Sequence, residues 1–268
     1  MLGGVGVQRS SQKGAAISMA AAANITSAVF LTIFVLANPP EYVKLSDVLW
    51  PALAGLLMAA TRPLLYEGMA RGPITVFAPG FGLTMIAVPA LIGPFIGESL
   101  SALEVFGVLF AFPAVVFLSS HSGLPKLNEI LRSRVIGLSL IVGINIGLAG
   151  IFISQANPEA GQIPVLVILG MGVVILTPIA RIRSGSFWPD IEIRKFGFVL
   201  GCTSGIAFIL STAAYMRGSV AVITALIALC PGVSVIVAWK FLKEEISTLQ
   251  IIGGIFGAAS VVFFSLGA

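Results

Sequence analysis

The sequence predicts an all-α membrane protein with two inverted repeats of five transmembrane helices, and three observations lead to this prediction. The 268 residues are 57% hydrophobic and only 10% charged, with a mean hydropathy of +1.07, whereas about a quarter of the residues of a soluble domain are charged. The apolar runs are long enough to cross a bilayer, which takes about 20 residues. The second half of the chain also repeats landmarks of the first half.

Nine apolar runs, separated by polar or Pro/Gly-rich breaks, mark the predicted spans. The runs are continuously apolar, which favours helices over the alternating pattern of a barrel. Breaks such as Asn38-Pro39-Pro40 end the runs because proline cannot continue a helix. The predicted spans are 14–37, 48–70, 73–96, 103–120, 134–154, 163–182, 196–216, 219–242 and 247–267.

A shift of 146 residues aligns the two halves of the chain. Arg71 then falls on Arg217, and Ser101 falls on Ser247. Over residues 71–119 there are 14 identities in 49 positions, without a gap. Apolar composition alone produces some matches, but it does not align polar landmarks together, so we interpret the pattern as an internal repeat.

The repeat divides the chain into a first repeat over 1–120, a linker over 121–133 and a second repeat over 134–268. The counterpart of the span 134–154 ends near residue 8. Residues 1–8 are therefore predicted to be the tail of a truncated first helix, which leaves about nine complete spans. An odd number of helices per repeat gives the repeats opposite orientations, a design that recurs in secondary transporters.

The basic residues predict how the chain lies in the membrane. The side richer in Lys and Arg is expected to face the cytoplasm, which places the C-terminus outside. The sequence thus predicts a multi-pass protein of the cell (inner) membrane. The opposite side has only Lys44 and Arg217, and the predicted cytoplasmic side has Arg9, Lys13, Arg71, Lys126, Arg132, Arg134, Arg181, Arg183, Arg194, Lys195, Lys240 and Lys243.

Arg62 is the most informative polar position, because it lies near the middle of the span 48–70. A charge there costs several kcal/mol unless it faces the bundle interior or a water-filled cavity. It is predicted to bind an anionic substrate group or a coupling partner, or else to pair with Glu67 or with helix carbonyls. Tyr66 shares its helix face. Glu67 shares that face only partly and is predicted to be an interfacial carboxylate or a proton carrier.

Other polar side chains complete the candidate substrate site. Asn24 and Asn145 are lone amides deep in their spans, so each must face another helix or the cavity. Tyr215 lies at the end of the span that corresponds to the Arg62 helix, as a cavity wall or an interfacial aromatic. Glu98 and Glu244 end equivalent spans and are predicted to cap the next helix.

The chain lacks the motifs of an enzyme or an ATP-driven pump. It has no Walker loop, no Ser/His/Asp arrangement and one histidine, His121. Cys202 and Cys230 lie in apolar runs and imply neither a disulfide nor a metal site. We therefore expect no enzymatic activity and no cofactor. Nucleic acid is not an expected partner, because no basic run is interleaved with aromatic residues.

The end of each repeat resembles the drug/metabolite transporter superfamily, EamA type. The second repeat carries the resemblance in Tyr215-Met216-Arg217-Gly218, Pro231 and Phe241-Leu242-Lys243-Glu244-Glu245, followed by Ser247 and Gly253. The first repeat shows it in Arg71-Gly72, Pro89, Gly97-Glu98-Ser99 and Gly107. The resemblance implies a central cavity between the repeats, efflux of amino acids or related solutes, and coupling to protons.

The leading hypothesis is a secondary transporter that lies in the lipid bilayer and moves a small-molecule substrate by alternating access. One alternative is a membrane enzyme on lipid-linked substrates, with residues 184–195 as its only polar cluster. Another is a non-transporting subunit or fragment. Three small-residue spacings predict close helix packing first and a homodimer second: Gly143/Gly147, Gly201/Gly205 and Gly253/Gly257.

Overall fold

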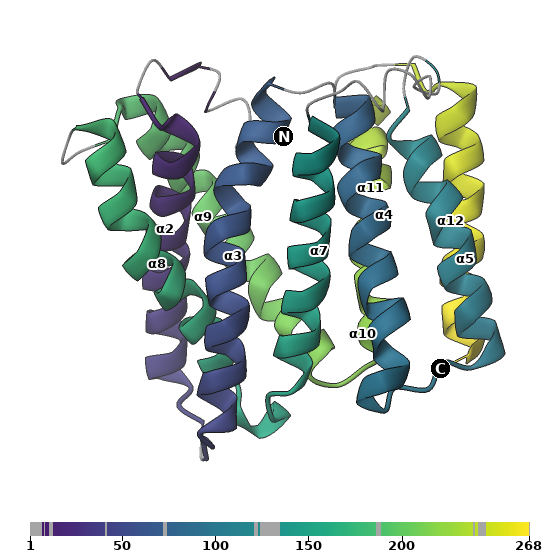
Figure 1. Cartoon of the computed structure of the whole chain (residues 1–268), viewed down its shortest axis with the longest axis horizontal. Helices are drawn as coiled ribbons and strands as arrows, with labels where there is room; N and C mark the ends of the chain where they lie inside the picture. Colours follow the sequence, from purple (N-terminus) through teal and green to yellow (C-terminus); the bar gives the residue numbers. More distant parts are fainter. Residues whose placement is uncertain are drawn as a thin grey trace. The chain divides into compact units, whose positions relative to one another are not determined.

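The protein is a helical, multi-pass membrane protein (Figure 1). A computed structural model describes residues 7, 9–10, 13–40, 42–71, 74–120, 123, 135–185, 189–237, 239–240 and 245–267. In this part of the chain the regular elements are all helices. Eight helical segments are long and apolar enough to cross a membrane, and Ala102–Leu118 is a shorter apolar helix.

The helices follow the predicted spans closely along the chain. Proline inside a span does not generally interrupt it, as Pro51 and Pro63 show within one helix. The elements are α2 (Ala15–Ala37), α3 (Ser46–Arg71), α4 (Ile74–Ile92), η1 (Gly93–Ile96), α5 (Ala102–Leu118), α7 (Val135–Ser154), η2 (Pro158–Ala160), α8 (Ile163–Ser184), α9 (Ile191–Tyr215), α10 (Val220–Ala228), α11 (Cys230–Val237) and α12 (Thr248–Gly267).

Two boundaries differ from the predicted spans. Helix α9 begins at Ile191, five residues before the predicted start. The added turn contains Arg194 and Lys195, whose side chains are exposed. Polar side chains of this kind are good helix formers, so a helix can continue beyond its apolar region. The span 219–242 is divided into α10 and α11 at Leu229. Pro231 explains this break, since it lacks an N–H and its ring crowds the carbonyl of Ile227.

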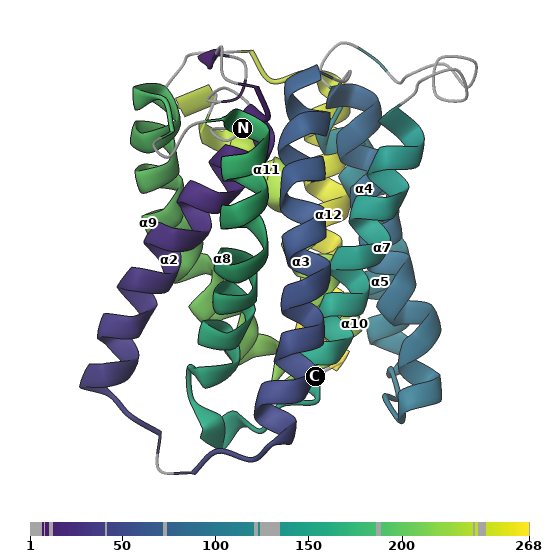
Figure 2. The same cartoon turned by 60° about the vertical axis from the view of Figure 1, so that its left-hand side comes forward.

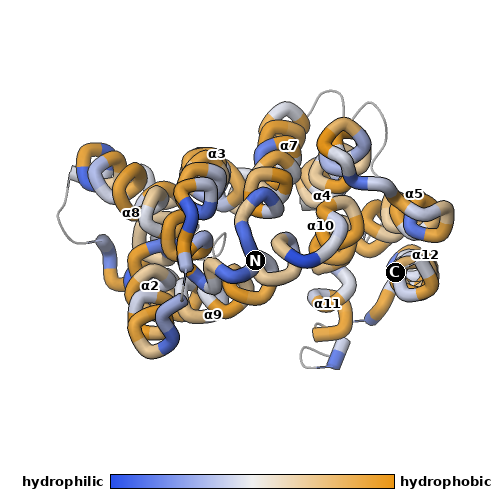
Figure 3. The backbone as a smooth tube through the Cα atoms, turned by 90° about the horizontal axis from the view of Figure 1, so that it is seen from below, coloured by the Kyte–Doolittle hydropathy of each residue, from blue (hydrophilic) through white to orange (hydrophobic). Residues whose placement is uncertain are grey.

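The surface of the helices is strongly apolar. Figure 3 shows mostly hydrophobic helices with short hydrophilic stretches. Leu36, Val174 and Phe198 are 76%, 70% and 63% exposed. A surface with so many large exposed apolar side chains suits lipid rather than water.

The chain forms two compact units. The first contains residues 1–72 and 148–217, and the second contains residues 73–147 and 218–268. Each unit combines helices from both predicted repeats. The repeat boundaries predicted from the sequence are thus not the boundaries of the compact units. The predicted linker 121–133 lies outside the described residues, apart from Gly123.

In the first unit, α2 packs on α9 and α8, and α3 packs on α8 (Figure 2). Glycines allow the close approach. A Cβ on Gly201 would lie 2.8 Å from the carbonyl oxygen of Ala23, and one on Gly55 would lie 3.0 Å from the Cα of Ile168. The Ser27 hydroxyl donates a 2.7 Å hydrogen bond to the carbonyl of Gly201.

In the second unit, α5 and α12 pack side by side, and α4 contacts α10 (Figure 1). A Cβ on Gly107 would lie 2.5 Å from the Phe264 ring, and one on Gly253 would lie 2.7 Å from the backbone nitrogen of Leu118. The Ser260 hydroxyl donates a 2.7 Å hydrogen bond to the carbonyl of Gly107. The order of these contacts shows that α5 and α12 run antiparallel.

Glu98 is a helix cap, but it caps a different helix from the predicted one. Its Oε1 accepts a 3.1 Å hydrogen bond from the N–H of Val220 at the start of α10. The next helix, α5, is capped by Ser101 and Glu104 instead. A carboxylate at a helix start satisfies an otherwise unpaired N–H and opposes the positive end of the helix dipole. Glu244 lies outside the described residues.

Candidate functional site

Arg62 and Asn24 form a buried polar pair inside the first unit. Arg62 lies on α3 and is 7% exposed, and Asn24 lies on α2 and is 3% exposed. The Nη1 group of Arg62 donates a 2.5 Å hydrogen bond to Oδ1 of Asn24. The bond joins two predicted site residues that lie 38 positions apart in the sequence. Asn24 thus neutralises none of the positive charge but supplies one oxygen acceptor for it.

The ring of Phe208, on α9, covers one face of the Arg62 guanidinium. The guanidinium carbon lies 4.6 Å from the ring centroid, within the range of a cation–π interaction. Phe208 is not among the residues predicted for the site. The signal was nevertheless present, because position 62 shifted by 146 residues is position 208. The position that the predicted repeat pairs with Arg62 therefore contributes to its surroundings.

In the described part of the chain, no carboxylate pairs with Arg62. Its contacts are those to Asn24 and Phe208, and no carboxylate oxygen lies within 4.0 Å of it. The predicted ion pair between Arg62 and Glu67 is not formed. Asp47 is the other described charged side chain that is buried, and its two oxygens accept hydrogen bonds from the N–H groups of Lys44 and Asn157.

Five buried side-chain atoms of the first unit have no described hydrogen-bond partner: Oγ of Ser18, Nδ2 of Asn24, Oε1 of Gln162, Oγ1 of Thr177 and Oγ1 of Thr212. Thr212 lies one helical turn after Phe208, on the same face of α9. Gly172 of α8 approaches Asn24 so closely that a Cβ there would lie 2.9 Å from the amide group. A buried donor without a partner is costly, so the surroundings of Asn24 favour an additional acceptor.

The two tyrosines predicted for the site are both buried. Tyr66 is 7% exposed and packs in an apolar cluster that includes Ala20 of α2 and Leu176 of α8. Tyr215 is 5% exposed, and its ring packs against Gly150 of α7, where a Cβ would lie 3.1 Å from a ring carbon. Burial argues against the interfacial interpretation of Tyr215.

Glu67 lies on a different face of α3 from Arg62. It lines a cavity of about 680 Å³ in the first unit, together with Pro63, Ser10, Lys13 and Arg183. Arg62 is not part of that lining. The structure thus brings Glu67 close to two basic side chains and separates it from the pair formed by Arg62 and Asn24. Whether Glu67 carries protons stays a prediction.

Asn145, the sixth predicted site residue, belongs to the second unit. It lies on α7 and is half-buried. Neighbouring turns of α7 pack on α4, since a Cβ on Gly143 would clash with Thr84 and one on Gly147 would lie 2.8 Å from Val88. A role of Asn145 in a site with Arg62 stays a prediction.

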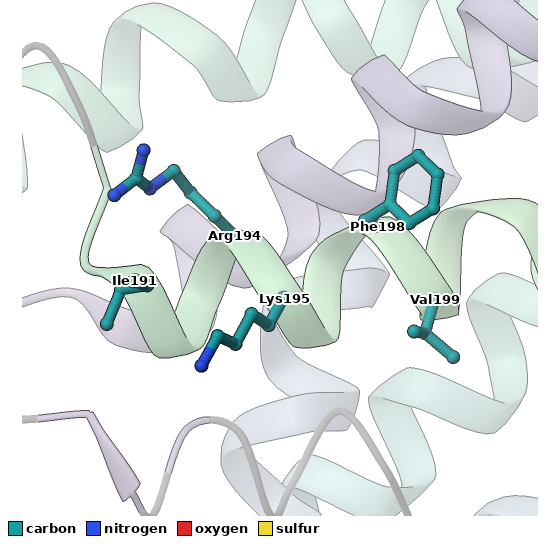
Figure 4. Close-up of a pocket in the computed structure, with 5 residues that line it drawn as sticks. All are labelled: Ile191, Arg194, Lys195, Phe198 and Val199. Carbon is teal, nitrogen blue, oxygen red and sulfur yellow. The ribbon is translucent and has the colours of Figure 1, made fainter.

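A separate hollow of about 500 Å³ lies on the exposed face of α9 (Figure 4). Ile191, Arg194, Lys195, Phe198 and Val199 line it. All five side chains belong to one helix, and Figure 4 shows Arg194 and Phe198 on one side of the ribbon. The hollow contains none of the predicted site residues. Among the described residues, no group of three His, Cys, Asp or Glu could hold a metal ion.

Comparisons with known proteins identify the fold but no activity. No protein-family model matches the chain, and no curated protein matches it. Solved structures do match. One, described only as a crystal structure of a protein, has a TM-score of 0.72 and 16% sequence identity, and the match covers 98% of this chain and 90% of that chain. At this identity the likeness shows a shared fold alone.

Proposed function

We propose that the chain is a secondary active transporter of a small metabolite that works by alternating access, built from two inverted repeats of five transmembrane helices. In this proposal α5, with 17 residues, is counted as a span at the lower end of the usual length. The observation that carries the proposal is Arg62, a charged side chain buried in a transmembrane segment with no described carboxylate partner.

The helix boundaries support the repeat. Shifting α2 by 146 residues gives 161–183, against 163–184 for α8, and shifting α5 gives 248–264, against 248–267 for α12. The shifted α3 covers 192–217, against 191–215 for α9. A chance resemblance of apolar segments does not predict that three helices start within two residues of their counterparts.

Reciprocal contacts support the inversion of the repeats. Gly107 packs on Phe264, and Gly253 packs on Leu118. The 146-residue shift relates position 107 to position 253, and position 118 to position 264. It therefore converts one contact into the other, with the two helices exchanged. Since α5 and α12 run antiparallel, they are related as two copies of one helix in opposite orientations would be.

The first unit has the same reciprocity. The shift converts the α2–α9 contact into the α8–α3 contact, and both contacts are formed. Figure 1 shows α2 and α8 running in opposite directions. Inverted halves of this kind provide two similar conformations, open to either side of the membrane, when the halves exchange their shapes.

The remaining parts of the proposal rest on the resemblance to EamA-type transporters and on charge. Amino acids or related solutes are the proposed substrates, export is the proposed direction and protons are the proposed coupling ion. The excess of basic residues at one membrane face supports a cytoplasmic position for that face. The proposed membrane is the inner membrane of the cell.

A transport assay on a panel of solutes tests the proposal. The full chain would be reconstituted in vesicles, and uptake of amino acids and related metabolites would be measured with and without a proton gradient. Arg62→Ala should abolish the gradient-dependent uptake of whichever solute is transported, while the protein still inserts. Arg217→Ala is the matched control, because Arg217 is exposed at the end of α9. Wild-type rates for Arg62→Ala would contradict the role of Arg62.

A further inference from the structure

The buried charge of Arg62 requires a compensating anion. A cation without a compensating anion costs several kcal/mol inside a low-dielectric span. The cost is similar when a buried ion pair loses its anionic partner. The ring quadrupole of Phe208 and the Asn24 oxygen offset part of this cost, and neither carries a net charge. The described residues of the first unit therefore leave one positive charge unbalanced beside the two helices α2 and α9.

The geometry leaves one edge of the guanidinium for such an anion. Nη1 is engaged by Asn24, and one face of the group is covered by Phe208. Nη2 and Nε have no described acceptor, and 7% of the Arg62 surface stays accessible. The Nη2–Nε edge is a planar fork of two parallel N–H donors, whose spacing matches the two oxygens of a carboxylate.

The amide group that contacts Nη1 of Arg62 contains a second unsatisfied donor. Asn24 holds its Oδ1 against Arg62, so its Nδ2 group belongs to the same small region, and this Nδ2 is buried without a partner. Gly172 packs against the amide and leaves little room for it to turn away. A bound oxygen acceptor would satisfy Nδ2 and the free edge of Arg62 together.

We propose that Arg62 and Asn24 form the binding site for the carboxylate of a small solute with one such group, an inference that rests on the proposed function for the identity of the solute as a substrate. One guanidinium balances one negative charge. A phosphate, which carries more than one charge near neutral pH, would leave an excess negative charge buried in the span. An uncharged amide would leave the cation unbalanced. The site therefore favours a carboxylate over both.

Binding to the purified full chain tests the site directly. Thermal unfolding in detergent would be followed with sodium acetate, lactate and benzoate, with inorganic phosphate and with acetamide, all at constant ionic strength. Carboxylate should raise the melting temperature in a concentration-dependent manner, because a ligand that binds only the folded state stabilises it. Phosphate and acetamide should not. Equal shifts with phosphate would overturn the preference for a carboxylate.

Asn24→Asp is the most discriminating variant. It places an internal carboxylate where the Asn24 amide contacts Arg62, with almost no change of shape. The variant should melt at a higher temperature than the wild type without ligand and should lose the carboxylate-dependent shift. If Asn24→Asp bound carboxylate as well as the wild type does, the proposal would be overturned. The internal carboxylate would then already balance Arg62 and yet not compete with the ligand.

Three further variants separate charge, geometry and folding. Arg62→Gln should abolish the shift, and Arg62→Lys, which keeps the charge but loses the planar fork, should weaken binding by about tenfold or more. Arg217→Gln, the exposed control, should bind as the wild type does. If Arg62→Gln does not fold, the Lys variant decides, and unchanged binding by it would contradict the bidentate geometry.

The same measurements distinguish failure of the site from failure of the proposed function. Carboxylate binding that depends on Arg62, with no transport of any bound solute, would leave the site correct and the transporter proposal wrong. Proton-dependent transport of an uncharged solute that persists in Arg62→Gln would leave the transporter proposal correct and the carboxylate site wrong.

Discussion

The guanidinium carbon of Arg62 lies 4.6 Å from the centroid of the Phe208 ring, and the 146-residue shift of the proposed repeat converts position 62 into position 208. In the first repeat the position holds a cation, and in the second it holds an aromatic ring. In the proposed inverted repeats, two equivalent positions meet only near the axis that relates the repeats. The pair of Arg62 and Phe208 would therefore lie near that axis.

Removing the Phe208 ring should destabilise the protein. Phe208→Leu keeps an apolar side chain but loses the cation–π interaction with Arg62, so we expect a loss of about 0.5–2 kcal/mol in the free energy of unfolding. Phe208→Trp should keep the interaction. Thermal or denaturant unfolding in detergent measures the difference. Phe198→Leu, the same change at a position of α9 that is 63% exposed, should have little effect, and an equal loss there would contradict the explanation.

Neighbouring glycines of α12 should respond oppositely to substitution by alanine. A Cβ on Gly253 would lie 2.7 Å from the backbone nitrogen of Leu118, whereas one on Gly254 would meet nothing within 4 Å. Gly253→Ala should separate α12 from α5 and cost about 1–3 kcal/mol, the usual range for overpacking. Gly254→Ala should be neutral or slightly stabilising, since alanine is the better helix former. Melting temperatures of the two variants check this, and similar values would contradict the close contact.

The two repeats should lose similar stability when equivalent helix caps are removed. Ser101 exchanges hydrogen bonds with Glu104, at 2.7 and 3.2 Å, and Ser247 exchanges them with Gln250, at 3.0 and 3.3 Å. Ser101→Ala and Ser247→Ala should each cost about 1 kcal/mol.

The double variant should show the sum of the two losses, because each cap acts on a different helix. Ser265→Ala is the control, since its hydroxyl bonds to a carbonyl of its own helix, at Val261. Unfolding midpoints in denaturant give the comparison. A large loss for one cap and none for the other would show that the two helix starts are not equivalent.

The C-terminus should be accessible from outside the cell. The prediction follows from the excess of Lys and Arg at the opposite membrane face. A cysteine-reactive or antibody-accessible tag after residue 268 should be labelled in intact cells by a reagent that does not cross the membrane. A tag in a loop of the basic face, such as one inserted at Gly185, should be labelled only after the membrane is opened. Labelling in the reverse order would refute the orientation.

The positions of the spans could be predicted from the sequence because the bilayer thickness fixes the length of an apolar helix. The predicted span 14–37 became Ala15–Ala37, and 247–267 became Thr248–Gly267. The prediction failed where composition does not govern the backbone. Arg194 and Lys195 lie before the apolar run but inside the helix, and Pro231 divided one apolar run into two helices.

The sequence also identified the polar residues inside the predicted spans that need a polar partner. Arg62 and Asn24 are costly in a span unless a partner satisfies them, so the burial of both side chains inside the helix bundle could be expected. It could not show that the two side chains would bond to each other, nor that Glu67 would face a separate cavity. These helices are apolar around most of their circumference, so the sequence contains no stripe that marks the inner face.

The sequence by itself thus determined a helical membrane chain and a charge in the middle of a span, and it predicted an internal repeat of 146 residues. Only the tertiary structure decided which helices meet, that Phe208 covers Arg62, and that each compact unit draws on both halves of the chain. The physical reason is that contacts between membrane helices depend on small residues such as Gly172 and Gly201 meeting a matching surface. That match joins positions far apart in the chain, and apolar composition does not record it.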